Sequence, residues 1–98
     1  MVGSFIELYK SGESGQKSIN NSPRTSMIKL EITGSGSLEV SAQLSEKSEK
    51  YILGAIKAND FSKVVNLTQG LYTIEVSGYE NIFFNLTGEA TVRLKTIV

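Results

Sequence analysis

The last third of the chain, Gly70 to Val98, consists of three short runs in which apolar residues occupy every second position. These runs are Leu71–Val76, Asn81–Leu86 and Thr91–Leu94, and glycine-containing segments separate them. Because successive side chains of a strand point to opposite faces, such alternation places one face against a core and the other in water. Three runs joined by tight turns predict a three-stranded antiparallel meander at the C-terminus.

The same alternation extends through the middle of the chain. Met27–Thr33 and Leu38–Leu44 alternate as cleanly, with Leu44 among the residues expected to point inward. The flexible segment Gly34-Ser35-Gly36-Ser37 between them predicts the turn of a hairpin. Further candidate strands, which bring the set to about eight, are Ser4–Tyr9, Tyr51–Ala58 and Lys63–Leu67.

Two segments are less regular. Tyr51–Ala58 also suits a helical turn, but we favour a strand because Gly54 weakens a helix by about 1 kcal/mol. Lys10 to Ser26 is polar and contains Pro23, the single proline of the chain. We therefore expect a long loop over this range, and loops of that length are usually functional or disordered.

Turn signals recur at the spacing typical of sandwiches, jelly rolls and small barrels. We expect an all-β fold, a jelly-roll-like antiparallel β-sandwich of about eight strands. The chain has 98 residues, which suits one domain over residues 1–98. In a chain of this length, the free energy gained by burying the core nearly cancels the entropy cost of ordering the chain. We therefore expect a homo-oligomer.

Composition excludes several classes of site. The chain has neither cysteine nor histidine, which removes thiolate zinc sites, thiol catalysis and Ser-His-Asp triads. A single aspartate, Asp60, does not suit a calcium loop, so we expect no metal and no cofactor. Lys+Arg and Asp+Glu are 10 each, so we expect no nucleic-acid partner. A carboxylate pair for glycoside hydrolysis stays open, with the candidates Glu7, Glu13, Glu31, Glu39, Glu75, Glu80 and Glu89.

We expect neither a targeting signal nor a membrane-spanning segment. No apolar run approaches the ~20 residues that a membrane-spanning helix needs. The N-terminal sequence MVGSFIELYKSG lacks a basic start and a long apolar core, so we expect no signal peptide. We expect a cytoplasmic protein, or one that leaves the cell by lysis.

Five apolar residues are candidates for contact with other molecules. Phe61 and Tyr79 lie in or beside turns, where exposed rings bind sugars; the alternative is that both fold back over the core. Phe83 points opposite to its neighbours, and an outward Phe on a strand often marks an association face. Phe5 or Ile6 of the first strand is a further candidate for the same surface.

The turns of the C-terminal third resemble those of a known group of proteins. Val76-Ser77-Gly78-Tyr79 and Leu86-Thr87-Gly88 follow the order strand, Ser-Gly-Tyr, strand, Thr-Gly, strand. This order is similar to small Bacillus prophage β-domain proteins, namely the C-terminal domain of the exported lytic protein of the PBSX prophage and its single-domain SPβ-type relatives. The similarity covers most of the chain in order and spacing.

That resemblance implies a β-sandwich, a ring-like homo-oligomer and an association with host lysis or with the virion. It supplies no catalytic residue, because no catalytic motif matches. The expected function is a noncatalytic phage or prophage structural or lysis-accessory protein that self-assembles, located in the host cytoplasm until lysis or on the virion. Other phage proteins and the host cell wall are its expected partners. The alternatives are a carbohydrate- or cell-wall-binding module and, third, a cell-wall hydrolase.

Overall fold

The computed structural model describes residues 2–98, with side-chain burial from Phe5 onward. Nine antiparallel strands run through this part of the chain, and it contains no helix. Their bounds are β1 Val2–Tyr9, β2 Gly15–Asn20, β3 Met27–Gln43, β4 Tyr51–Ile52, β5 Ala55–Lys57, β6 Lys63–Val64, β7 Asn66–Leu67, β8 Gly70–Glu75 and β9 Asn81–Ile97. The expected all-β antiparallel class is confirmed. Among the described residues there is no helix that could cross a membrane.

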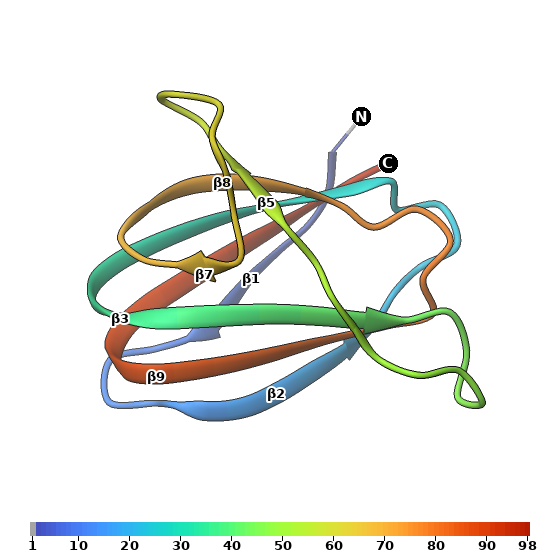
Figure 1. Cartoon of the computed structure of the whole chain (residues 1–98), viewed down its shortest axis with the longest axis horizontal. Coiled ribbons are helices and arrows are strands. Elements are labelled where there is room, and N and C mark those ends of the chain that lie inside the picture. Colours follow the sequence, from blue (N-terminus) through green and yellow to red (C-terminus); the bar gives the residue numbers. More distant parts are fainter. Residues whose placement is uncertain (1) are drawn as a thin grey trace.

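Two long strands organise the sheet. β3 and β9 have 17 residues each and pair along their whole length, from Met27 opposite Ile97 to Gln43 opposite Asn81. Figure 1 shows both strands curving round together, so that one continuous sheet folds back over itself into two layers. The sandwich is therefore made of two halves of one sheet.

Each layer is completed by shorter strands. The first layer has the order β1-β9-β3-β8-β5-β6 and uses the C-terminal half of β9 and the N-terminal half of β3. In the second layer, β2 pairs with the N-terminal half of β9, while β4 and β7 pair with the C-terminal half of β3. Every residue of β3 and β9 therefore belongs either to one layer or to the bend between the layers.

Facing glycines allow the bend. Gly36 of β3 lies opposite Gly88 of β9 in the register. A Cβ added to Gly88 would lie 2.9 Å from the Gly36 Cα, closer than real Cβ contacts. Gly88 also has a φ of +94°, which side chains other than glycine rarely adopt. The two strands turn the corner in contact because neither carries a side chain there.

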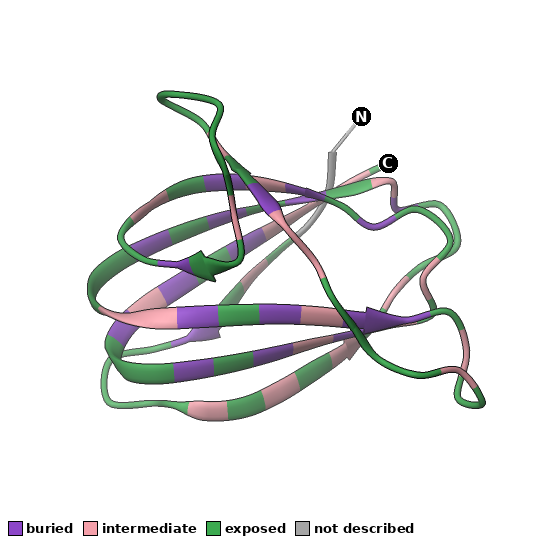
Figure 2. Ribbon diagram, in the orientation of Figure 1, coloured by how far each residue is buried: buried purple, intermediate pink, exposed green. Residues whose placement is uncertain are grey.

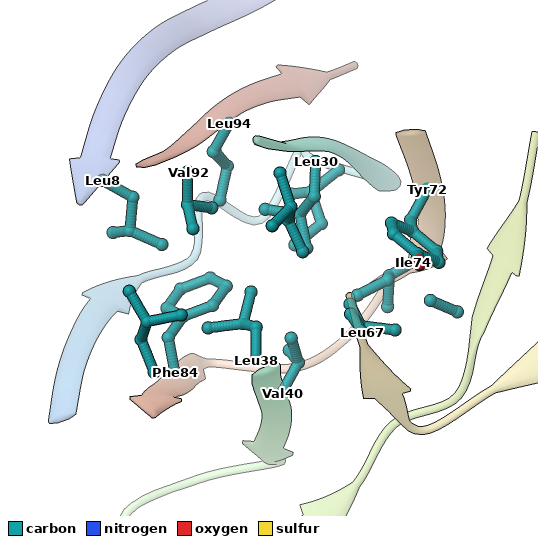
Figure 3. Close-up of a cluster of buried hydrophobic side chains, with 14 of the residues drawn as sticks. Leu8, Leu30, Leu38, Val40, Leu67, Tyr72, Ile74, Phe84, Val92 and Leu94 are labelled. Atoms are coloured by element: carbon teal, nitrogen blue, oxygen red, sulfur yellow. The ribbon is translucent and has the colours of Figure 1, made fainter. Parts of the chain in front are cut away.

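The two layers meet in one core. Figure 2 shows buried and exposed residues alternating along β3, β8 and β9. In Figure 3, Leu30 and Leu94 of the first layer point toward Leu38 and Phe84 of the second. The predicted inward residues that are buried are Ile28, Leu30, Ile32, Leu38, Val40, Ala42, Tyr72, Ile74, Val76, Ile82, Phe84, Leu86, Val92 and Leu94.

Tyr9 joins the end of β1 to the second layer. Its hydroxyl donates to the backbone oxygen of Gly15 at 2.6 Å and lies 3.2 Å from the backbone oxygen of Phe84. The ring is almost fully buried, and this burial raises the pKa of the phenol. One side chain therefore fixes the connection between β1 and β2 against β9.

The predicted C-terminal meander is wrong. Asn81–Leu86 and Thr91–Leu94 are the two ends of a single strand, β9, and the residues between them form its bend. The Leu71–Val76 run contributes to β8, which pairs with β3 and β5 and has no ladder with β9. Gly88 indicated a turn, but here glycine serves a bend within a strand.

The predicted hairpin is wrong for the same reason. Met27–Thr33 and Leu38–Leu44 do not pair with each other; both pair with β9, and Gly34–Ser37 is the part of β3 that bends. Leu44 lies beyond the end of β3 and is exposed rather than turned inward.

Three further boundaries differ from the prediction. Lys10 to Ser26 is not one loop, because β2 lies inside it. β2 shows no apolar alternation because Gly15 and Lys17 occupy positions on the same side as Ile19, the one apolar residue of the strand. Tyr51–Ala58 is extended, as favoured, but splits into β4 and β5. Lys63–Leu67 likewise splits into β6 and β7.

We predict that Gly88→Ala lowers the free energy of unfolding by about 2 kcal/mol or more, because it combines an unfavourable φ with a backbone clash. Gly78→Ala is the matched control, since Gly78 has a φ of +85° but nothing within 4 Å of its added Cβ. Urea unfolding followed by circular dichroism compares the two variants. Equal losses would show that close approach at the bend contributes nothing.

We predict that Ile74→Asp prevents folding, because it places an unpaired charge among fully buried side chains. Leu44→Asp is the control, because Leu44 is 58% exposed and a charge there stays in water. Thermal unfolding by circular dichroism reads out both. A cooperative transition near that of the wild type for Ile74→Asp would contradict the register of β8.

We predict that Tyr9→Phe costs about 1 kcal/mol at neutral pH through its lost hydrogen bond. The pKa of Tyr9 is raised in the folded state, so the un-ionised phenol stabilises the fold fully below pH ~10. This stabilisation is lost as the pH rises further, because the phenol of the unfolded chain ionises first. Stability should therefore fall less steeply above pH ~10 in Tyr9→Phe than in the wild type. Urea unfolding at several alkaline pH values measures this, with Tyr51→Phe as the exposed control. Parallel curves for wild type and Tyr9→Phe would contradict it.

Candidate functional site

A groove crosses the outer face of the second layer, over β2, the N-terminal half of β9 and the C-terminal half of β3. The register sets Ser18, Phe83 and Ser41 side by side in one row across these strands. The adjacent row contains Gln16, Asn85 and Glu39. Together with Lys50, these six side chains line a cavity of about 450 Å³. We call this cavity the Phe83 groove.

The ring of Phe83 forms the apolar part of the groove. It is half-buried and points away from the core, opposite to its neighbours Ile82 and Phe84. The ammonium of Lys50 lies 4.0 Å from the centre of the Phe83 ring, within the range of a cation–π contact. A flat aromatic surface is thus present among polar groups and is covered by one flexible side chain.

The polar side chains of the groove are unused within the protein. No hydrogen bond joins Gln16, Ser18, Glu39, Ser41 or Asn85 through its side chain to another residue in the described part of the chain. These groups therefore remain available to water or to a ligand.

The next row along the same strands behaves differently. The Nδ2 of Asn81 donates to the Oε1 of Gln43 at 3.1 Å, and the Nε2 of Gln43 donates to the backbone oxygen of Ser48 at 3.0 Å. The side chains of Asn81 and Gln43 are thus hydrogen-bonded within the protein, unlike the five polar side chains of the groove.

The charges of the groove balance. Glu39 and Lys50 contribute one of each sign. Lys17 also borders the groove, but its ammonium donates to the backbone oxygen of Leu8 at 2.7 Å and to the Oε1 of Glu13 at 3.0 Å. The pKa of Glu13 is lowered, first by the backbone N–H of Lys10 and then by the Lys17 ammonium. The site is therefore suited to a neutral ligand.

Phe61 and Tyr79 are not among the residues that line the Phe83 groove. Phe61 is 79% exposed and has a φ of +59° between β5 and β6. Beside it, Asp60 accepts from the hydroxyl and the backbone N–H of Ser62, which lower the pKa of Asp60. Tyr79 is half-buried and packs against the core. Phe61 is therefore exposed at its turn, whereas Tyr79 folds back over the core.

The proposed interface residues do not form one surface. Phe5 pairs with Lys95 in the first layer and is 61% exposed, whereas Phe83 lies in the second layer. Ile6 is partly buried and packs against the core. The three residues therefore occupy different environments, and only Phe5 is largely exposed.

The seven glutamates considered for a catalytic pair all lie exposed at the surface. Glu31 lies 3.3 Å from Arg93 and Glu13 lies 3.0 Å from Lys17, as partners of basic residues. The described residues contain no cluster of three or more side chains that could hold a metal ion.

Most groove residues were missed at the sequence level. Gln16 and Ser18 lie in the segment expected to be a loop, and Asn85, Glu39 and Ser41 are polar residues at outward strand positions. Such residues are normally solvated, and their meeting depends on the pairing of β2 and β3 with β9. Only Phe83 carried a signal, as an apolar residue out of phase with its strand.

Comparison with known proteins gives two structural neighbours. The SPBc2 prophage-derived protein YomS has a TM-score of 0.79 and 16% identity, over 97% of this chain and 92% of that chain. The PBSX exported protein XepA has a TM-score of 0.80 and 12% identity, over 97% of this chain and 37% of that chain. No protein-family model and no curated protein sequence matches the chain.

Both neighbours are Bacillus prophage proteins, so the expected resemblance is confirmed. At these identities the likeness establishes the fold. The chain spans nearly all of YomS but little more than a third of XepA.

Proposed function

We propose that this chain is a noncatalytic phage or prophage protein, structural or lysis-accessory in role, that works by self-assembly. The observation that carries the proposal is the fold, which two prophage proteins share over nearly the whole chain. Such a protein would act in the host cytoplasm until lysis or as part of the virion. The exposed positions of the candidate glutamates favour solvated charges over a catalytic pair.

We propose the outer face of the first layer as the surface for self-assembly. Four large apolar side chains on β1, β3, β5 and β8 are exposed there, namely Phe5, Met27, Ile56 and Leu71. In the register, Phe5 and Ile56 lie at the two ends of one row, and Leu71 and Met27 lie in the rows on either side of it. A second copy that covers this face would bury all four side chains. We therefore define these four residues as the first-layer face.

Charges on the same face complement one another. Glu7 lies opposite Arg93, and Arg93 lies opposite Glu31 across the three strands β1, β9 and β3. Lys95 and Lys29 form the adjacent row. Because both signs occur on one face, a second copy of the chain can place opposite charges against each other while the apolar residues are buried.

Light scattering across a tenfold concentration range tests self-assembly. We expect a constant mass equal to a multiple of the 10.7 kDa chain. Phe5→Asp should lower that mass by charging the first-layer face, while Phe61→Asp, the same change at an exposed ring outside the face, should not. A wild type that stays monomeric throughout would refute self-assembly. Equal masses for wild type and Phe5→Asp would move the interface elsewhere.

A further inference from the structure

We propose that the Phe83 groove binds a neutral pyranose sugar. The inference rests on a half-buried outward ring next to five polar side chains without partners among the described residues. It concerns the second layer and does not depend on self-assembly through the first-layer face. Carbohydrate binding was expected, as an alternative function, at Phe61 and Tyr79; the geometry favours Phe83.

The ring of Phe83 provides the surface on which a sugar can stack. One face of a pyranose carries mainly C–H groups, which are slightly positive and attracted to the negative face of an aromatic ring. Phe83 is flat, half-buried and held within β9 between β2 and β3, so stacking on it costs little ordering of the protein. The cavity of about 450 Å³ lies in the range of small-ligand sites.

The polar residues match sugar hydroxyls, which both donate and accept. Gln16 and Asn85 each offer an amide donor and an amide acceptor, Ser18 and Ser41 offer hydroxyls, and Glu39 offers a carboxylate acceptor. They lie in the two register rows nearest to Phe83. Because none hydrogen-bonds through its side chain to another described residue, a sugar replaces only water.

The charge balance selects a neutral ligand. A polyanion, such as a chain of alditol phosphates, would meet the Glu39 carboxylate, while Lys50 is the one groove cation not already paired with a carboxylate among the described residues. A neutral sugar meets no repulsion and can accept from Lys50 while it donates to Glu39.

Lys50 covers the ring when the groove is free. Its side chain is exposed, and its ammonium lies 4.0 Å from the ring centre. Cation–π contacts at exposed positions are weak, so a stacking sugar can displace the ammonium. The displaced group remains within reach of the ligand as a hydrogen-bond donor.

The test is a titration followed by the amide resonances of ¹⁵N-labelled full-length protein. The probes are a β-1,4-linked tetramer of N-acetylglucosamine, the matching glucose tetramer and a polyglycerol phosphate. We expect saturable shifts at Ser18, Ser41, Phe83 and Asn85 with at least one neutral tetramer. The comparison of the two tetramers shows whether the acetamido group, and hence a wall-type sugar, is preferred.

Variants then assign the site. Phe83→Leu keeps an apolar side chain but removes the flat ring, and it should weaken binding by about tenfold or more. Phe61→Leu makes the same change at a different exposed ring and should leave the affinity unchanged. Asn85→Ala, at an exposed position, should weaken binding without loss of fold, which circular dichroism checks for each variant.

Three outcomes would overturn the proposal of a sugar site at Phe83, and a fourth would overturn the neutral ligand. The first three are no shifts with either neutral tetramer up to about 10 mM, shifts confined to the surroundings of Phe61 or Tyr79, and equal affinity in Phe83→Leu and wild type. Preferred binding of the polyglycerol phosphate would also contradict the neutral ligand. Light scattering of Phe83→Leu separates this proposal from self-assembly: an unchanged mass with lost binding supports the groove, whereas a lowered mass assigns Phe83 to an interface.

Discussion

The pairing of β3 with β9 is the interaction on which the rest of the structure depends. These strands hydrogen-bond along 17 residues each and contribute to both layers. Strands β1 and β2 pair with β9, and strands β4, β7 and β8 pair with β3. Strand β5 is joined to β3 through β8, and β6 is joined through β5. A change that separates β3 from β9 therefore removes both layers at once rather than one of them.

The bend within this pair converts one sheet into a sandwich. An antiparallel sheet normally buries one face and leaves the other in water. Here the buried face of one half lies on the buried face of the other half, so Leu30 and Leu94 find Leu38 and Phe84 as partners within the same strand pair. Folding the sheet upon itself gives a small chain a two-layered core without a second sheet. Gly36 and Gly88 make this possible because they leave room at the corner.

The alternation of apolar residues predicted which side chains are buried but not how the strands connect. Ile28, Leu38 and Phe84 face the core as expected, because burial depends on local period alone. Glycine has two uses that look identical in a sequence: it reverses a chain at a turn, and it lets a strand bend without reversal. Gly36 and Gly88 serve the second use. The predicted hairpin is therefore one long strand, β3, and the last two runs of the predicted meander are one long strand, β9.

The Phe83 groove illustrates a second limit of prediction from the sequence. Phe83 was recognisable because its phase conflicts with that of its strand, whereas the polar residues around it had no local signature. Their common position arises from pairing between segments far apart in the chain, with Ser18, Phe83 and Ser41 joined only through β9. Position relative to a partner strand is a property of the fold, and it becomes visible only when the register is known.

The order of the strands along the chain also has a consequence for biosynthesis. β1 and β2 are made first, yet among the described strands both pair only with β9, which is made last. Until β9 has been made, the backbone groups of β1 and β2 lack their partner strand, and β3 lacks one of its neighbours. The domain therefore completes its sheet only after β9 has been made, by contacts between distant segments that form slowly. A nascent chain of this kind is open to association with its own copies before it closes.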